Sequence, residues 1–468
     1  MALLSMDSAN TPMHLSTVEI FDPGDEGFNY RQLVALVGDR LAFVPRYRQR
    51  LMSVPGSVAR PVWVDDADFD LGYHVRQSAV PRPGSMEQLE ELVARIIARP
   101  LDRTRPLWEM YLIEGLEHGR FAILVKSHQT LVDGISTIDL GQVILDTDTI
   151  SRERIPDDWV PRREPSAAAI LAEAVQEQLS SPVSAVGGVR DGVAGLVKAS
   201  PLFAGRRSVP DSPLQTATSQ QRRFHAVRTY LDDYRKVRRF HGGTVNDVVL
   251  ATITGALRAW LMTRAESVHS SRQLRAMVPM GVLDKDLEPT SLGSQVTGTI
   301  LTLPIGEQSP VVRLHQVSYA LKAHKDTGNA ASALRLIGVG GFAPTTFHAL
   351  GARVAAEQAA QRGFNLVVTN VPGPQFPLYA CDSRMLESYP VQPLLPGHAL
   401  AIGVTSYDGG VHYGLTADRD AIPDVDVVGQ CITEALAELV DTTTESTMRA
   451  PRGRDRSGPR PGTGPGKS

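Results

Sequence analysis

The chain has 468 residues, of which 48 are basic and 51 are acidic, for a net charge of -3. This length exceeds one ordinary hydrophobic core and predicts two domains of roughly 200 residues each. Because neither sign of charge is concentrated in the folded part, the composition excludes nucleic acid as the expected partner and favours a small or lipidic substrate.

The N-terminal residues and the cysteines predict the compartment. Residues 1–25 lack a basic start and a continuous apolar stretch, so no signal peptide is indicated. No run of about 18 uncharged apolar residues follows, which argues against a membrane span. The only cysteines, Cys381 and Cys431, are typical of reduced core thiols in a chain this long. We expect a cytoplasmic protein that is free to touch a membrane from the side.

Apolar periodicity in the first half predicts a strand, two helices and a β-hairpin. The expected segments are, in order, a strand at 14–21, helices at 29–44 and 85–100, and hairpin strands at 108–116 and 121–128. The helix at 85–100 places its leucines, valine and isoleucines at helical spacing and stops at Pro100.

A predicted helix at 166–180 and a crossover rich in Ser, Pro, Gly and Arg come before the second half. The expected segments are a strand at 222–230, helices at 231–242 and 245–262, strands at 274–282 and 294–305, helices at 309–325 and 330–360, strands and turns over 364–418, and a helix at 424–440. Thr244 or Asn246 is expected to cap the long helix at 245–262.

This order predicts an α/β protein with two sandwich domains whose sheets are mixed and mainly antiparallel. The expected boundaries are an N-terminal domain at 1–180, a crossover linker at 181–220, a C-terminal domain at 221–443 and a disordered tail at 444–468. No glycine-rich fingerprint follows a strand, which argues against a doubly wound nucleotide-binding fold.

Three segments combine apolar stripes or loops with scattered basic residues, namely 170–179, 187–207 and 334–356. The first two fit the surface of a membrane or lipid droplet and fit equally well a linker packed on the protein. The third, with its Gly-Gly-Phe-Ala-Pro centre, would suit an exposed apolar loop.

The stretch KSHQTLVDGIS at 126–136 interrupts an apolar strand with a polar turn. His128 ends the strand, and Asp133 and Gly134 close the turn. An imidazole held there by a rigid sheet can remove a hydroxyl proton near neutral pH and return it later. The alternative is a strand-end histidine that only makes a local hydrogen bond. Gly134 most simply permits the tight turn.

Several stretches together carry a family resemblance. They are LLSMD near the N-terminus, PMHL at 12–15, RPLDRTRPLWEMYLIEGL at 99–116, TVNDVVLATITGALRAWL at 244–261, LGSQVTGTILTLP at 292–304 and NLVVTNVPGP at 365–374. In order and spacing the chain resembles the bacterial wax ester synthase and acyl-CoA:diacylglycerol acyltransferase family, one of the CoA-dependent acyltransferases with chloramphenicol-acetyltransferase-like domains, which include peptide-synthetase condensation domains.

The resemblance implies an O-acyltransferase that moves a long acyl chain from acyl-CoA to diacylglycerol, giving triacylglycerol, or to a fatty alcohol, giving wax ester. Two domains would enclose a tunnel in which both substrates meet at residues 128–134. Acyl-CoA is a co-substrate, and neither a cofactor nor a metal is implied. The other histidines, such as His14, His225 and His398, also lack the spacing of metal ligands.

The chain departs from the family's HHxxxDG signature, which becomes HQTLVDG at 128–134. Gln129 stands where the resemblance implies the general base, and a carboxamide cannot take a proton near neutral pH. His128 would substitute only if a bent turn brought it to the cleft, because neighbouring side chains of an extended strand face opposite ways. The resemblance assigns Asp133 a structural role with an arginine. A second hypothesis is therefore a non-catalytic acyl-lipid binding protein.

Four further residues are candidates for lining the tunnel. Asn246 and Asp247 match the family's Asn-Asp helix and also fit a helix cap. Gln295 lies in the stretch that resembles a Gly-Asn-Gln strand, where Ser294 replaces the usual Asn. Asn370 precedes Val-Pro-Gly-Pro, a sequence that imposes a rigid turn.

Overall fold

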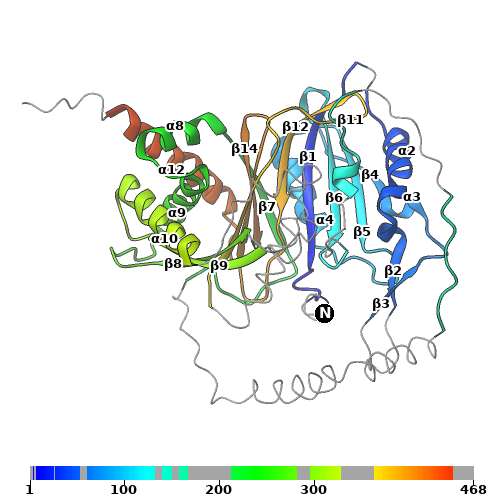
Figure 1. The fold of residues 1–468 in the computed structure, drawn as a ribbon, viewed down its shortest axis with the longest axis horizontal. Helices are drawn as coiled ribbons and strands as arrows, with labels where there is room; N and C mark the ends of the chain where they lie inside the picture. The colour runs from blue at the N-terminus through cyan, green and yellow to red at the C-terminus, as the bar shows by residue number, and fades with distance from the viewer. Residues whose placement is uncertain are drawn as a thin grey trace, which may run out of the picture.

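The computed structural model describes residues 4, 7–25, 27–52, 61–131, 140–149, 158–166, 212–281, 296–327 and 363–445. Figure 1 shows these residues as two large neighbouring sheets flanked by helices. The predicted helices at 166–180 and 330–360, the segments at 170–179, 187–207 and 334–356, and nearly all of the predicted tail lie outside the described residues.

In the described residues, the first half supplies four strands of one six-stranded sheet, a separate two-stranded sheet (β2 and β3), and helices that pack around them. They are β1 (His14–Asp22), α2 (Tyr30–Arg40), β2 (Gln49–Met52), β3 (Val62–Asp65), α3 (Leu71–His74), β4 (Val75–Ala79), α4 (Met86–Ile97), β5 (Trp108–Glu114), β6 (Phe121–His128) and α5 (Leu140–Val143). The predicted strand and the hairpin β5–β6 are confirmed, and so is the helix predicted at 85–100, although α4 ends at Ile97, before Pro100. No strand was expected where β2, β3 and β4 lie.

The second half supplies most of the other sheet and its helices. They are β7 (Arg222–Tyr230), α8 (Leu231–His241), α9 (Val245–Thr263), β8 (Leu274–Gly281), β9 (Val296–Leu303), α10 (Pro310–Thr327), β10 (Leu366–Pro372), β11 (Tyr379–Ala380), β12 (Ser383–Val391), β13 (Leu400–Tyr407), β14 (Gly410–Asp418) and α12 (Val425–Glu445). α12 continues past its predicted end at residue 440 and into the first residues of the predicted tail.

One helix prediction is wrong at its end. The helix expected at 29–44 stops at Arg40 and gives way to two short 3-10 turns, Leu41–Phe43 and Pro45–Arg48. Proline lacks an amide hydrogen and disfavours the helical conformation of the residue before it, so the helix cannot continue through Pro45. Val44 accordingly adopts φ -130° and ψ 63°.

Among the described residues the first sheet has six strands in the order β11-β12-β1-β6-β5-β4. The pairs β12–β1, β1–β6 and β6–β5 are antiparallel, and β5–β4 is parallel because α4 crosses between them. Two of the strands, β11 and β12, come from the second half of the chain. The division of the chain at residues 181–220 stays a prediction, and the two halves share this sheet.

The second sheet also has six described strands, in the order β7-β14-β13-β10-β8-β9. β13, β10 and β8 run parallel, and the pairs at either edge are antiparallel. Both sheets are therefore mixed, and the predicted α/β class with two sandwich domains is confirmed.

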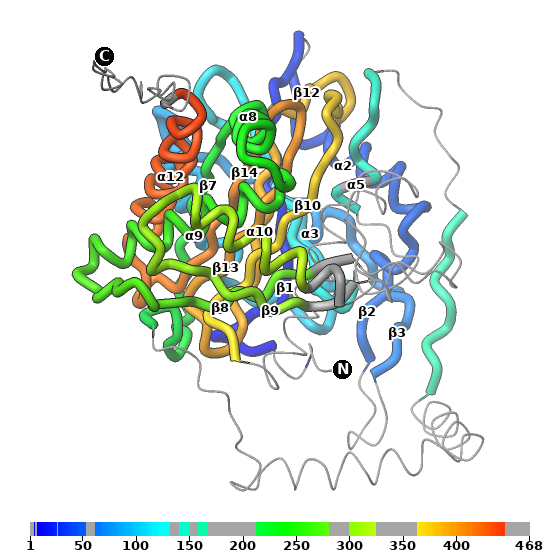
Figure 2. Tube along the Cα trace, turned by 60° about the vertical axis from the view of Figure 1, so that its left-hand side comes forward, coloured from blue at the N-terminus to red at the C-terminus, as the bar shows by residue number. Residues whose placement is uncertain are grey.

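Helices pack on the faces of both sheets, and β1 and β6 are the two central strands of the first sheet. α8, α9, α10 and α12 gather on one side of the second sheet, and Figure 2 shows α12 beside α8 and α9. α4 packs its buried Leu89, Val93, Ile96 and Ile97 against one face of the first sheet, and a capping box between Ser85 and Gln88 begins this helix. α2 packs against the opposite face.

α9 is, within the described ranges, the one helix long and apolar enough to cross a membrane by length and composition. It lies instead in the core of the second domain, with 72% of its most apolar window buried in the protein. Thr244 caps it through a capping box with Asp247, as the sequence predicts for one of its two candidate caps.

Candidate functional site

The end of strand β6 carries the first group of candidate residues. β6 lies between β1 and β5, and His128 sits directly opposite His14 of β1. His14, Lys126 and His128 share the face covered by α4, since His14 Nε2 lies 2.7 Å from the Ile97 carbonyl oxygen. The backbone is thus extended up to His128, and the imidazole faces α4.

Burial controls the charge of the groups beside His128. Desolvation lowers the pKa of Lys126 to about 8, although Glu109, whose carboxylate lies 3.6 Å from Nζ, opposes this effect. Burial, followed by the nearby Lys126, holds the pKa of His14 well below its usual range. His14 is therefore a neutral imidazole at physiological pH, and it contributes no charge to this face of the sheet.

Each nitrogen of the His128 ring faces a different partner. Nδ1 lies 2.8 Å from Thr130 Oγ1 and 3.2 Å from the Thr130 amide nitrogen, which donates to it. Nε2 lies 3.4 Å from Asp7 Oδ2, which is close enough for charge attraction although it is not a well-aligned hydrogen bond. His128 is only 2% exposed.

Asp7 is a carboxylate fixed from several sides. Its Oδ1 accepts a 2.9 Å hydrogen bond from the Met13 amide, and Arg103 Nη2 donates to Oδ2 at 2.7 Å. Burial alone would raise the pKa of Asp7, but the contacts with His128, Met13 and Arg103 outweigh burial and hold the pKa far below its usual range. The carboxylate is therefore negative at every physiological pH.

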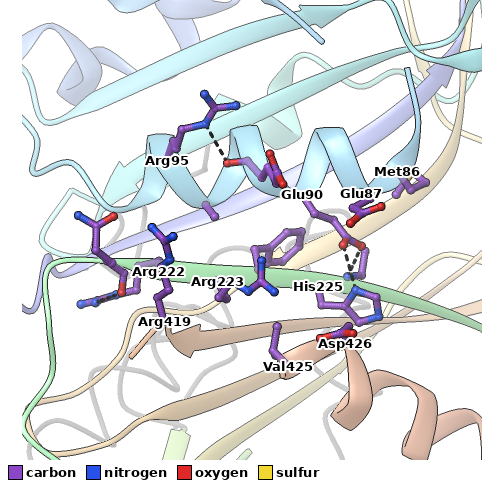
Figure 3. Close-up of a pocket in the computed structure, with 15 residues that line it drawn as sticks. Met86, Glu87, Glu90, Arg95, Arg222, Arg223, His225, Arg419, Val425 and Asp426 are labelled. Carbon is purple, nitrogen blue, oxygen red and sulfur yellow. Dashed lines mark hydrogen bonds and ion pairs between the residues drawn. The ribbon is translucent and has the colours of Figure 1, made fainter. Parts of the chain in front are cut away.

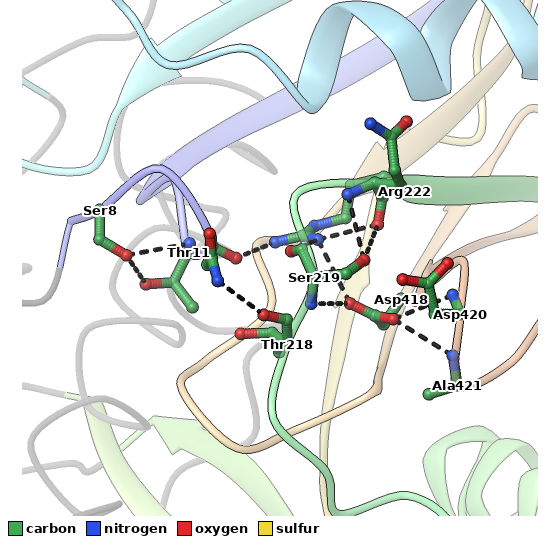
Figure 4. A network of polar contacts seen from close by, with 10 residues as sticks. Ser8, Thr11, Thr218, Ser219, Arg222, Asp418, Asp420 and Ala421 are labelled. Carbon is green, nitrogen blue, oxygen red and sulfur yellow. Dashed lines mark hydrogen bonds and ion pairs between the residues drawn. The ribbon is translucent and has the colours of Figure 1, made fainter.

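The segment that carries Asp7 is tied to the second half of the chain (Figure 4). Asn10 Nδ2 donates to the Thr218 carbonyl at 3.0 Å, and Arg222 Nη2 donates to the Asn10 carbonyl. In the same network, the Ser219 amide donates a 2.6 Å hydrogen bond to Asp418 Oδ2. These bonds fix the start of β1 relative to β7 and β14.

Gln129 follows the last residue of β6 and is 1% exposed. Its backbone amide continues the ladder by donating to the Met13 carbonyl at 3.1 Å. Neither its amide oxygen nor its amide nitrogen has a hydrogen-bond partner in the described part of the chain. Leaving a buried carboxamide unpaired costs about 1–3 kcal/mol, so a group that pairs with Gln129, beyond the part of the chain that the structure describes, would recover that free energy. Asp133, Gly134 and Gln295 lie outside the described residues, and their roles stay predictions.

The second group of candidates meets where α9 begins. Asp247 Oδ2 accepts from the Thr244 amide at 2.9 Å and from Ser318 Oγ at 2.8 Å, which are contacts of a helix cap. Asn370, in β10, donates from Nδ2 to Asn246 Oδ1 at 2.9 Å. The structure thus joins Asn246 to Asn370. Among the described residues, no hydrogen bond or ion pair connects this group to His128 or Gln129.

A separate cavity of about 610 Å³ lies between α4 and the edge formed by β7 and the start of α12 (Figure 3). Glu90 reaches across this junction, with Oε2 2.9 Å from His225 Nδ1 and Oε1 accepting from the Ala226 amide at 2.9 Å. The carboxylate thereby links the first sheet's helix to the second sheet's edge strand.

Comparison with known proteins identifies the family. The catalytic-domain model for wax ester synthases/diacylglycerol acyltransferases matches residues 1–249, and the model for their C-terminal domain matches residues 292–440. A probable diacylglycerol O-acyltransferase of Mycobacterium tuberculosis, tgs1, is 32% identical over 94% of this chain and 93% of its own length. The chain belongs to the wax ester synthase/diacylglycerol acyltransferase family.

Two further relatives agree with this assignment. The probable diacylglycerol O-acyltransferase tgs3 of Mycobacterium tuberculosis is 44% identical over 50% of this chain and 91% of its own length. The wax ester synthase/diacylglycerol acyltransferase structure from Marinobacter aquaeolei superposes with a TM-score of 0.66 at 27% identity, covering 94% of this chain and 98% of that one. The resemblance drawn from the sequence motifs is confirmed.

Within this wax ester synthase/diacylglycerol acyltransferase chain, the structure brings forward residues that motif reasoning missed. Asp7, Arg103 and Thr130 surround the motif histidine, although none was a candidate. Asp7 and Arg103 do lie in two of the stretches that carry the family resemblance. Their proximity to His128 could not be inferred, because it depends on how the N-terminal segment crosses the end of β6.

Proposed function

We propose that this member of the family is an acyl-CoA-dependent O-acyltransferase that transfers a long acyl chain to the hydroxyl of diacylglycerol. The observation that carries the proposal is the match to the family over both halves of the chain, together with relatives named diacylglycerol O-acyltransferases. Fatty alcohols, which would give wax esters, are a second acceptor class suggested by the family's name.

The reaction requires a thioester carbonyl and an alcohol to be held together. Gln129 suits the binding part of this task, since no residue in the described ranges pairs with its buried carboxamide, which can donate to and accept from a substrate oxygen or hydroxyl. Positioning two substrates in one site lowers a barrier by several kcal/mol even without a titrating base. The substrates would meet near residues 128–134, and the lipid acceptor would be drawn from a membrane or lipid-droplet surface.

The proposal is tested with purified protein, long-chain acyl-CoA, and either diacylglycerol or hexadecanol as acceptor. We expect the parent protein to form triacylglycerol with stoichiometric release of CoA, and the Gln129→His variant to be faster because it regains an imidazole at the family's position. Product is measured by chromatography and mass spectrometry, and CoA by thiol titration. The proposal fails if the parent forms no product while Gln129→His turns over. That result would indicate a scaffold that binds acyl lipids without catalysis.

A further inference from the structure

Thr130 and Asp7 lie on opposite sides of the His128 ring and give its two nitrogens different roles. The Thr130 amide donates to Nδ1, and the Thr130 hydroxyl lies 2.8 Å from the same nitrogen. A nitrogen that accepts hydrogen bonds carries no proton, so in neutral His128 the proton is on Nε2 and faces Asp7. A carboxylate on one nitrogen and a hydroxyl on the other is the arrangement by which a histidine draws a proton from an alcohol.

We propose that Thr130, His128 and Asp7 form a proton relay that supplies the base missing at position 129. This inference rests on the proposed acyl-transfer function. Both ring nitrogens of His128 face protein groups, Nδ1 facing Thr130 and Nε2 facing Asp7, so the ring does not meet a substrate directly. Thr130 lies beyond the end of β6 and is partly exposed. Its hydroxyl is therefore the group that connects the imidazole to the acceptor alcohol.

The relay moves one proton in each direction. The acceptor hydroxyl gives its proton to Thr130 Oγ1 while Thr130 gives its own proton to His128 Nδ1, and the acceptor oxygen forms its bond to the thioester carbonyl carbon. When the carbon–sulfur bond breaks, the proton returns from Nδ1 through Thr130 to the CoA thiolate. The products are the ester and free CoA, and all three residues end as they began.

Asp7 acts as a positioning residue through His128. Its negative charge stabilises the imidazolium that exists between the two proton transfers. Arg103 and the Met13 amide already occupy both carboxylate oxygens, which prevents Asp7 from rotating away. The bonds of Asn10 to Thr218 and Arg222 hold the whole segment in place. A purely local turn would explain the contact of Thr130 with His128 but would not require a buried carboxylate at Nε2.

The test compares Thr130→Val, which removes the hydroxyl and keeps the side-chain shape, with Thr130→Ser, which keeps the hydroxyl. Thr130→Val is expected to lower kcat about 10²-fold with KM little changed, and Thr130→Ser is expected to stay within about 10-fold of the parent. Asp7→Asn, which retains an acceptor for the Met13 amide, should lower kcat by at least about 10-fold. Thr263→Val, the same change at an exposed helix end, is the matched control and should match the parent.

A second arm separates a relay from a structural role. In a Gln129→His background the imidazole at position 129 takes the proton itself, so adding Thr130→Val should change kcat by less than about 3-fold. Equal losses in both backgrounds, an undiminished Thr130→Val variant, or an acyl adduct on Thr130 in the intact mass would each overturn the relay. Absence of turnover in both the parent and Gln129→His would overturn the proposed function and the relay with it.

Discussion

The contact between the two sheets depends on Gly414, and a single added methyl group tests it. β12, which belongs to the first sheet, crosses the face of β14 so closely that a Cβ on Gly414 would overlap the Pro390 carbonyl oxygen and lie 2.9 Å from the Pro390 carbonyl carbon. A real Cβ atom essentially never lies within 3.0 Å of a heavy atom that is not its chain neighbour. Both obstructing atoms are backbone, so the two strands would have to separate by roughly 1 Å.

We expect Gly414→Ala to lower the free energy of unfolding by about 3 kcal/mol or more, the upper part of the range for overpacked cores. Gly403→Ala should cost less, about 1–2 kcal/mol, because its Cβ would meet the Pro390 ring at 2.9 Å rather than a carbonyl. Gly38→Ala is the control, since Gly38 lies in α2 with only an ordinary 3.5 Å contact to Leu71, and alanine favours a helix by about 1 kcal/mol.

Urea unfolding followed by tryptophan fluorescence and by circular dichroism measures the three variants against the parent. Two probes are needed because a chain with two domains does not always unfold in one step. If Gly414→Ala were as stable as the parent, or if the three changes cost the same, the close crossing of β12 over β14 would be wrong.

Three further changes test the described packing. Glu90→Gln should lower stability by about 1–3 kcal/mol, because a charged acceptor shared by two donors is neutralised, whereas the exposed Glu91→Gln should be silent in the same thermal melts. Burial, with a smaller effect of Arg228, lowers the pKa of His412 from 6.5 to about 3. As the pH falls from 6.5 towards 3, only the unfolded chain binds a proton at this histidine, so the free energy of unfolding decreases over that range. His412→Phe should therefore reduce the pH dependence of the free energy of unfolding there by up to about 1.4 kcal/mol per pH unit. Thr244→Ala should cost about 1 kcal/mol through loss of the cap that Thr244 shares with Asp247, with KM unchanged, and a raised KM would favour a tunnel-lining role for this end of α9.

Sequence patterns predicted well those helices and strands that depend on interactions between residues close together in the chain. The spacing of apolar residues gave α4, and the turn between two apolar runs gave the hairpin β5–β6. The same rules failed for the helix expected at 29–44, because Pro45 pushes Val44 out of the helical conformation. The short strands β2, β3 and β4 escaped detection because their neighbours, rather than their own sequences, decide that they pair.

At the candidate site, too, the sequence predicted some features and missed those that depend on distant contacts. HQTLVDG identified the motif and the lost base at Gln129 without any structure, because the chemistry of a side chain is a property of the residue itself. The alternation of a strand also accounts for the His128 side chain lying on the face that it shares with His14 and Lys126. Motif reasoning, however, treated Thr130 as an unremarkable position and Asp7 as part of a family signature.

The sequence alone therefore determined the family, the α/β class and the identity of the residue that replaced the base. Tertiary structure decided what surrounds His128, since Asp7 lies more than a hundred positions earlier in the chain and reaches the ring only because the N-terminal segment runs beside the end of β6. It also decided that β12 completes the first sheet. Such contacts depend on the summed packing of distant elements, and no local pattern of residues encodes that sum.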